Sequence, residues 1–130
     1  YNIYHWSNAE KVIFNKLLEK YNIKYNLNWI DLHYIFKNNP IYIKGANSYS
    51  LKDISKSMFS NNQISTIWED EDINGCDAIY YSLLAEDNCK KNNINNILDF
   101  YLMDKIIKYN EIDCKVMYDI LNYINNNILE

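Results

Sequence analysis

The first part of the chain alternates between polar and apolar residues and then changes to a helical repeat. Tyr1 to Trp6 alternates and is rich in residues that favour strands, so it predicts a short β-strand. The stretch Ser7-Asn8-Ala9-Glu10 matches a capping box, with Ser7 as N-cap and Glu10 at N3, and predicts a helix start. In that helix, lysines occupy one side and apolar residues the other, namely Val12, Ile13, Leu17 and Leu18.

The middle of the chain contains shorter apolar stretches between polar breaks. Trp29 to Phe36 predicts a short helix or turn, which ends at the polar run that reaches Pro40. Ile41 to Ile43 predicts a short strand or an extended link. Ser50-Leu51-Lys52-Asp53 is a second capping signature, and it predicts a helix that runs to about Phe59.

Helical spacing dominates the last part of the chain. Glu69 to Asn74 is acidic and predicts a loop, and Asp77 to Leu84 predicts a helix. Cys89 to Asn96 is polar and predicts a linker. Asp99 to Ile128 repeats apolar residues at helical spacing, which predicts either one long helix or two helices with a break near Tyr109. The small numbers of glycines and prolines, 2 and 1, also favour helices over a many-stranded β protein.

Length and composition limit the class of protein. A chain of 130 residues with 48% hydrophobic residues predicts one folded domain over 1–130. The net charge of −4 argues against a protein that binds nucleic acid through an overall positive charge. A metal site is compatible with this negative charge. The sequence has no apolar run of the roughly 20 residues that a membrane span needs. Three cysteines without CxxC spacing fit a reducing compartment, so we expect a cytoplasmic protein.

Two residues on the last predicted helix could take part in catalysis. Tyr109 and Asp113 are four positions apart, which puts a phenol and a carboxylate on the same helix face. A carboxylate can bind a divalent cation and a phenol can orient a water, as in a metal-dependent hydrolase. The alternative is a half-buried tyrosine packed under a surface aspartate. Glu10, just after a strand, either caps its helix or reaches a metal.

Other kinds of site lack their sequence patterns. His33 and the three cysteines have no zinc-ligand spacing. A G-x-S-x-G nucleophile elbow is missing, and two glycines cannot build a phosphate-binding loop. The acidic run Glu69-Asp70-Glu71-Asp72 is more typical of a surface loop than of a cation site.

Four stretches, taken in order, resemble one family. Tyr4 to Glu10 resembles the second motif of the DEDD-superfamily, RNase H-like 3′–5′ exonucleases, in which an acidic residue follows a strand. Trp29 to Leu32 resembles their hydrophobic-Asp-Leu segment, and Tyr49 to Ile54 their S-L-K-x-I helix start. Tyr109 to Cys114 resembles the third motif of the tyrosine-containing branch, Y-N-x-x-D. The similarity is strongest to the RecB-associated, YprB-type ribonuclease H-like domain.

The resemblance implies an α/β, RNase H-like fold and metal-dependent cleavage of DNA or RNA. Two Mg²⁺ or Mn²⁺ ions would be bound by carboxylates, with Asp113 and Glu10 as metal ligands. Tyr109 would orient the attacking water, so the predicted catalytic residues are Tyr109, Asp113 and Glu10. The residues predicted to contact nucleic acid are His5, Asn8, Lys52 and Asn110.

One part of the family pattern is missing from this chain. The first motif, D-x-E on the opening strand, supplies two carboxylates, and no D-x-E precedes Glu10. Because the chain starts without Met and directly on a predicted strand, we expect a truncated, helix-rich C-terminal portion of the domain that lacks its opening strands. The two-metal site would then be incomplete, and the fragment alone inactive, whereas a longer parent protein, with possible further domains, would be the exonuclease.

Two alternatives remain from the sequence. A non-catalytic, helix-rich module could bind nucleic acid or protein on a degenerate nuclease scaffold, without any effect of divalent cations. An unrelated small helical domain could carry Tyr109 and Asp113 as ordinary helix residues. The nuclease hypothesis differs from both in requiring Glu10, Tyr109 and Asp113 to converge on one cleft.

Overall fold

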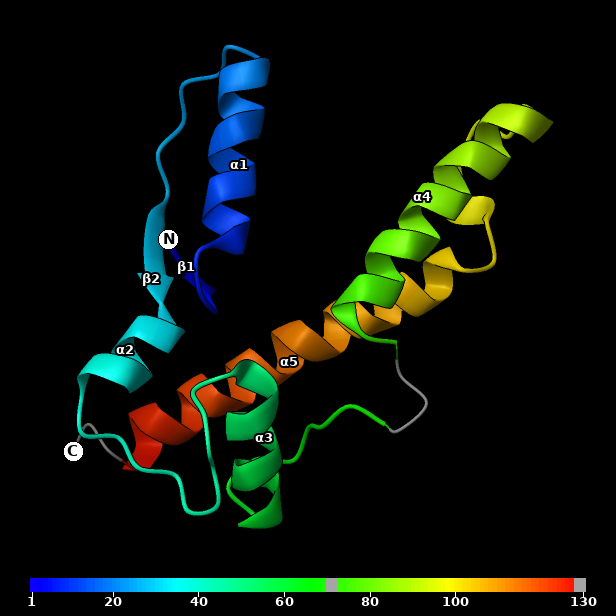
Figure 1. The fold of residues 1–130 in the computed structure, drawn as a ribbon. Helices are drawn as coiled ribbons and strands as arrows, with labels where there is room; N and C mark the ends of the chain where they lie inside the picture. Colours follow the sequence, from blue (N-terminus) through cyan, green and yellow to red (C-terminus); the bar gives the residue numbers. More distant parts are fainter. Residues whose placement is uncertain (70–72, 128–130) are drawn as a thin grey trace. The chain divides into compact units, whose positions relative to one another are not determined.

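The computed structural model describes residues 1–69 and 73–127. These residues form an α/β structure rich in helix, with a two-stranded parallel sheet (Figure 1). Backbone contacts divide the chain into two compact units, Tyr1–Ser65 with Asp119–Glu130, and Thr66–Tyr118. We call these unit 1 and unit 2 and describe each by itself.

Unit 1 begins with a strand, a helix and a second parallel strand. Strand β1, Asn2–His5, pairs with β2, Asn28–Asp31, and His5 lies opposite Asp31. Helix α1, Ala9–Lys20, provides the crossover that two parallel strands require. The strand predicted at the start of the chain is therefore confirmed.

The second strand corrects a prediction. Trp29, Ile30 and Asp31 were predicted as helix or turn, but they form β2, because they pair with β1 along its whole length. Helix α2, Leu32–Asn38, starts only after this strand. Asp31 is its N-cap, and its Oδ1 accepts a hydrogen bond from the backbone N–H of Tyr34 at 3.2 Å.

The capping box predicted at Ser7 is wrong. Asn8 is the N-cap of α1, without a side-chain hydrogen bond, and Glu10 therefore stands at the second helical position rather than the third. Ser7 instead adopts a left-handed conformation with φ of 73°, and its N–H donates to Asp31 Oδ1 at 3.0 Å. Glu10 is exposed and takes no part in a cap, although its carboxylate stands in the first turn of α1, where negative charge stabilises a helix.

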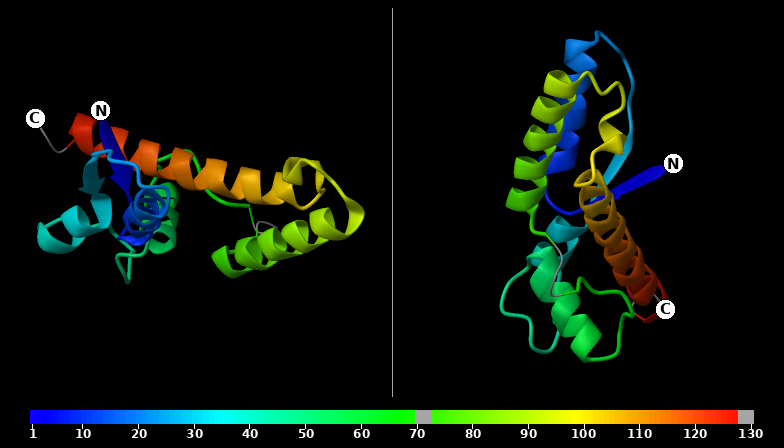
Figure 2. Two further views of the ribbon diagram at one scale, coloured as in Figure 1. Left: turned by 90° about the horizontal axis from the view of Figure 1, so that it is seen from above. Right: turned by 90° about the vertical axis from the view of Figure 1, so that its right-hand side faces the viewer.

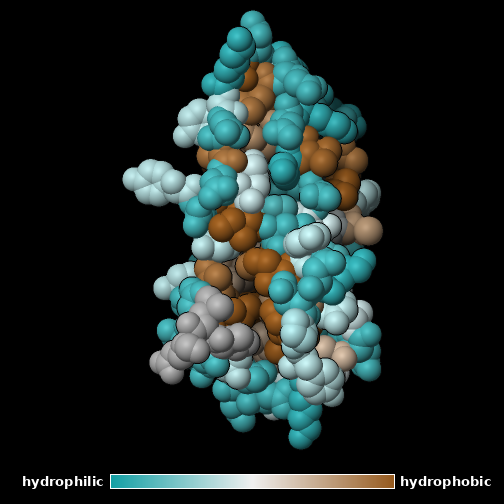
Figure 3. Space-filling model, turned by 90° about the vertical axis from the view of Figure 1, so that its left-hand side faces the viewer, coloured by the Kyte–Doolittle hydropathy of each residue, from teal (hydrophilic) through white to brown (hydrophobic). Residues whose placement is uncertain are grey.

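Helix α1 also differs from the expected amphipathic packing. None of its residues is buried, and three apolar side chains predicted to face a core are about half exposed: Val12 at 47%, Ile13 at 59% and Leu17 at 46%. Apolar residues are also visible at the surface where β2 and α2 lie (Figure 3). There, Ile30, Ile35, Pro40 and Leu121 line a hollow of about 470 Å³ in unit 1.

The core of unit 1 lies among α2, helix α3 (Leu51–Ser60) and the last part of helix α5 (Met103–Asn127). Residues 41–43 form a link without regular secondary structure, in which Ile43 is buried. The most buried apolar side chains of the unit are Leu32, Phe36, Ile54, Met58 and Ile120. The predicted cap of α3 is confirmed, because Ser50 Oγ accepts a hydrogen bond from the N–H of Asp53 at 3.2 Å.

This cap gives a stability prediction. Ser50→Ala removes the oxygen that satisfies a helix N–H, and we expect it to lower the free energy of unfolding by about 1 kcal/mol. Ser7→Ala is the matched control, because Ser7 does not cap a helix, and we expect a change within about 0.5 kcal/mol. Urea denaturation followed by circular dichroism measures both. Equal effects of the two substitutions would contradict the assigned caps.

Unit 2 is a helical hairpin. Helix α4, Gly75–Asn92, is followed by a short 3₁₀ helix, η1, at Ile97–Asp99, and the chain reverses direction before α5 (Figure 2). Asn74 and Asp77 form a capping box at the start of α4. The linker predicted over Cys89 to Asn96 begins later than expected, because α4 continues to Asn92 and ends at Asn93 in a left-handed conformation with φ of 53°.

Helix α5 is one helix, without a break near Tyr109. Its residues up to Tyr118 belong to unit 2, and those from Asp119 belong to unit 1. The predicted end at Ile128 and the acidic residues 70–72 lie outside the described residues. Over 1–69 and 73–127, no helix combines the length and the apolar content that crossing a bilayer requires.

Candidate functional site

Tyr109 and Asp113 lie one helical turn apart on α5, within unit 2, and both are half-buried. The sequence prediction that α5 is helical at this position is confirmed. Asp113 Oδ1 accepts a hydrogen bond from Trp68 Nε1 at 3.0 Å. Trp68 is 9% exposed, so a nearly buried indole fixes the orientation of this carboxylate.

The phenol of Tyr109 is kept in its neutral form. Burial raises its pKa above the ordinary value for tyrosine, and the negative charge of Asp113 raises it further, because both disfavour the phenolate. A Cβ placed on Gly75 would lie 3.9 Å from the Tyr109 hydroxyl, so the first residue of α4 is close to this phenol. A tyrosine is protonated at neutral pH in any case, and the raised pKa extends the pH range over which Tyr109 keeps its hydroxyl proton.

The pKa of Tyr109 gives a testable pH dependence. Asp113→Asn removes the charge but not the burial, so we expect the pKa of Tyr109 to fall while staying above its ordinary value. Because the folded-state pKa is raised, the stability that this group contributes is complete below the unfolded pKa and is lost as pH rises through the folded pKa. NMR of ¹³C-labelled tyrosine measures the titration. An unchanged Tyr109 pKa in Asp113→Asn would contradict the contact between the two groups.

The other predicted residues are divided between the two units. Glu10, Asn8 and Lys52 are exposed in unit 1, and Asn110 is exposed in unit 2. Because Glu10 belongs to unit 1 whereas Tyr109 and Asp113 belong to unit 2, their convergence on one cleft stays a prediction.

His5 has a well-defined place in unit 1. It is 3% exposed, its Nδ1 donates to the Ser7 carbonyl, and its ring meets Trp29 edge-on with centroids 5.4 Å apart. His5 thereby shapes the loop between β1 and α1, and its predicted contact with nucleic acid stays a prediction.

Two residues of the site arrangement were missed in the sequence. Trp68 precedes Asp113 by 45 positions, and no local spacing connects the two. In the sequence, Asp31 stands out only as part of the Trp29 to Leu32 stretch. In the structure, its carboxylate accepts hydrogen bonds from the N–H groups of Ser7 and Tyr34. It thereby fixes the turn that carries Asn8 and Glu10, at the carboxyl end of a parallel strand, where α/β proteins place binding residues.

Comparison with known proteins settles the family. A sequence model for the RNase H superfamily matches residues 1–125. The chain belongs to the RNase H superfamily. Separate comparisons with curated proteins and with solved structures gave no match.

Membership of the RNase H superfamily confirms the predicted α/β, RNase H-like class. It also indicates a nuclease-like scaffold with nucleic acid as the substrate class. The matched range includes all four stretches that carry the resemblance, from Tyr4 to Cys114. The narrower assignment to the tyrosine-containing exonuclease branch is a proposal.

The two predicted metal ligands, Asp113 and Glu10, belong to different units of the chain. In residues 1–69 and 73–127, no group of three or more histidine, cysteine, aspartate or glutamate side chains is placed to bind a metal ion. A divalent ion such as Mg²⁺ takes about six oxygen ligands, and two ions need several carboxylates between them. Asp113 and Glu10 alone would supply only part of such a ligand set.

Proposed function

We propose that this chain is part of a metal-dependent nuclease that hydrolyses phosphodiester bonds of DNA or RNA from the 3′ end. The proposal places it in the tyrosine-containing branch of the DEDD superfamily, close to the YprB-type domains. The observation that carries it is the neutral Tyr109 phenol beside the Asp113 carboxylate, which Trp68 orients. Family membership over 1–125 supports a nucleic-acid substrate.

Each residue in the proposal has a separate role. Asp113 would be a ligand for Mg²⁺ or Mn²⁺, and such ions supply a nucleophilic water and neutralise the leaving oxygen when bound. Trp68 keeps the carboxylate in one orientation through its indole N–H. Tyr109 would orient the water by its hydroxyl group. Glu10 would offer a second carboxylate.

A nuclease assay on the protein in its full natural length tests this proposal. Oligonucleotides of DNA and RNA, labelled at the 5′ end, are incubated with Mn²⁺, with Mg²⁺ or with EDTA. We expect a ladder of products shortened from the 3′ end, which EDTA abolishes. Binding without cleavage in every metal would contradict the proposal and favour a non-catalytic module.

The hydrogen bond from Trp68 gives a prediction about how the Asp113 carboxylate is positioned. Trp68→Phe keeps an aromatic ring but removes the N–H that Asp113 accepts, and partners of metal ligands typically contribute about 10- to 100-fold to activity. We expect cleavage to fall in that range and a higher concentration of Mn²⁺ to recover part of it. Trp6→Phe is the control, because the Trp6 indole also donates one hydrogen bond, to the Tyr49 carbonyl at 3.0 Å. An equal loss in both variants would refute a specific role for Trp68.

A further inference from the structure

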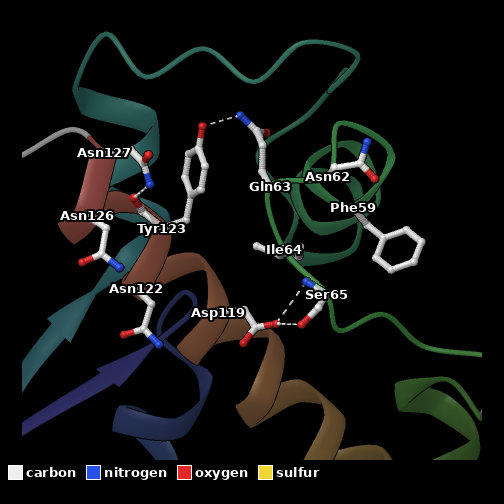
Figure 4. A pocket seen from close by; sticks show the side chains of 10 residues that line it. All are labelled: Phe59, Asn62, Gln63, Ile64, Ser65, Asp119, Asn122, Tyr123, Asn126 and Asn127. Carbon is white, nitrogen blue, oxygen red and sulfur yellow. Dashed lines mark hydrogen bonds between the residues drawn. The ribbon is translucent and has the colours of Figure 1, made fainter.

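Two hollows of unit 1 differ in the charge of the residues that line them. The larger, of about 650 Å³, lies between the segment that follows α3 and the last turns of α5 (Figure 4). Asp119 is its only charged group among the described residues, and this carboxylate accepts hydrogen bonds from the N–H and the hydroxyl of Ser65, at 3.4 and 3.3 Å. A hollow with a negative charge does not attract an anion.

The second hollow, of about 390 Å³, has the opposite charge, and we call it the lysine hollow. It lies within unit 1, between the loop that precedes α3 and one side of that helix (Figure 1). Lys44 and Lys56 line it with one carboxylate, Asp53, so one positive charge is in excess. The other lining residues are Gly45, Ser57, Ser60 and Asn61. Because the whole chain has a net charge of −4, this positive lining is a local feature.

Hydrogen bonds hold the loop against α3 at both ends of that helix. Near the start of α3, Asp53 Oδ2 accepts hydrogen bonds from the N–H groups of Asn47 and Ser48, at 2.9 and 2.5 Å. At the end of α3, Asn61 Nδ2 donates to the Lys44 carbonyl at 2.8 Å. The walls of the lysine hollow are therefore fixed by the fold itself, which lowers the entropic cost of binding a ligand there.

The lysine hollow contains polar groups that the chain itself does not use. Within the described residues, neither Lys44 nor Lys56 forms an ion pair. Ser57 is only 8% exposed, and its hydroxyl makes no hydrogen bond in the described part of the chain. A Cβ placed on Gly45 would lie 3.8 Å from Ser57 Oγ, so a glycine at this position leaves the hydroxyl open to the hollow. An acceptor oxygen on a ligand would compensate the lost hydration of this hydroxyl.

The C-terminal end of α3 opposes an anion, but the two lysines outweigh it. A helix carries about half a negative charge at this end, on carbonyls that lack partners. In α3, the carbonyls of Ser57, Met58 and Phe59 accept hydrogen bonds from the backbone N–H groups of residues 61–63, at 2.9 to 3.1 Å. These bonds reduce the partial charge further, whereas each lysine carries a full positive charge.

We infer that the lysine hollow binds one phosphate group of a nucleic-acid strand. Lys44 from the loop and Lys56 from α3 would neutralise its charge, and the Ser57 hydroxyl would donate to one of its oxygens. The choice of a strand over free phosphate rests on the proposed function and on the RNase H superfamily match. Lys52, which the sequence predicts to contact nucleic acid, lies one helical turn before Lys56. The inference thus adds a strand contact in unit 1 to the Tyr109 and Asp113 pair of unit 2.

A phosphate site predicts a particular dependence on salt. A lysine that neutralises a phosphate releases counterions, and each phosphate contact with a single strand contributes about 0.7 to the slope of log affinity against log salt. Loss of one contact therefore narrows the gap in affinity between wild type and variant by about 5-fold for each tenfold rise in NaCl. Because phosphates carry no sequence information, the loss should be the same for every base sequence.

The experiment is fluorescence anisotropy with labelled single-stranded DNA and RNA in EDTA, over a series of NaCl concentrations. We expect the double variant Lys44→Gln with Lys56→Gln to bind more weakly at low salt, with a slope about 0.7 shallower than that of the wild type. The control is Lys16→Gln with Lys37→Gln, which removes the same charge from two exposed lysines of unit 1 outside the hollow. Equal changes in both double variants would mean that binding follows overall charge, and would overturn the inference.

Urea denaturation separates binding from a purely structural role of the lysines. Lysines near the C-terminal end of a helix also stabilise that helix. We expect the lysine hollow variant to keep a midpoint of unfolding close to that of the wild type while its affinity falls. A lower midpoint with wild-type affinity and slope would assign Lys44 and Lys56 to the stability of α3 and would overturn the phosphate site.

Glycine signals give a test that needs no variant. The chain has two glycines, of which Gly45 lines the lysine hollow and Gly75 begins α4 in unit 2. In the wild-type chain labelled with ¹⁵N-glycine, we expect single-stranded DNA, and an abasic strand of the same length, to shift the Gly45 signal. Inorganic phosphate at the same concentration of phosphate groups should shift it much less. Equal shifts from inorganic phosphate, or an unchanged Gly45 signal with DNA, would overturn the inference.

The outcomes separate this inference from the proposed function. Wild-type affinity and slope in the lysine hollow variant, with metal-dependent cleavage intact, would overturn the phosphate site and leave the nuclease proposal standing. Weakened binding with a shallower slope in that variant, without any cleavage by the wild type, would support the phosphate site and refute the nuclease. A wild type that neither binds nor cleaves oligonucleotides would overturn both.

Discussion

Asp113→Asn is expected to lower metal-dependent cleavage by the full natural-length protein by at least about 100-fold, because partners of metal ligands already contribute about 10- to 100-fold. The amide oxygen of asparagine can still accept the Trp68 hydrogen bond, so the local structure should persist. What disappears is the negative charge that a divalent cation requires. Initial rates over a range of Mn²⁺ concentrations measure the effect.

Glu111→Gln is the matched control for this substitution. Glu111 lies two residues before Asp113 on α5, and its carboxylate pairs with Lys115 at 2.7 Å on an exposed surface. Exposed ion pairs one helical turn apart contribute only about 0.3–0.5 kcal/mol to stability, so this variant should cleave and unfold like the wild type. Full cleavage by Asp113→Asn would remove Asp113 from the proposed site.

Phe36→Ala is expected to have the largest effect on stability, a loss of about 3–5 kcal/mol, because it opens a cavity in the core of unit 1. Phe36 is 0% exposed, and its ring lies 5.3 Å from that of Trp6, centroid to centroid. Tyr34→Ala, on the same helix but 64% exposed, should change stability by no more than about 0.5 kcal/mol. Urea denaturation followed by circular dichroism compares the two. Similar midpoints would show that α2 is not packed as described.

The elements that the sequence predicts well are those that local chemistry determines. The alternation at the start of the chain predicts β1, and the Ser50 cap predicts the start of α3, because both signals lie within the element itself. Trp29 to Asp31 was assigned wrongly, because its strand conformation depends on pairing with β1, which lies 26 residues earlier in the chain. The Ser7 cap was predicted wrongly for a related reason. The Ser7 N–H donates to the Asp31 carboxylate, which lies 24 residues later in the chain, and Ser7 adopts a left-handed conformation instead of the extended one of an N-cap.

The candidate site shows the same division between local and distant contacts. Helical spacing alone places Tyr109 beside Asp113, and the structure keeps them on one uninterrupted helix. The contact of Asp113 with Trp68 spans 45 residues and has no counterpart in any short motif.

The half-exposed apolar side chains of α1 have a practical consequence for work with this protein. Val12, Ile13 and Leu17 expose apolar surface on a helix that has no buried residue. Exposed apolar surface promotes self-association at the concentrations used for NMR and crystallisation. Replacing Val12 and Leu17 by glutamate would add negative charge, which improves solubility, and would leave the packed interior untouched. Helix α1 is thus the element at which substitutions should improve the solubility of the protein.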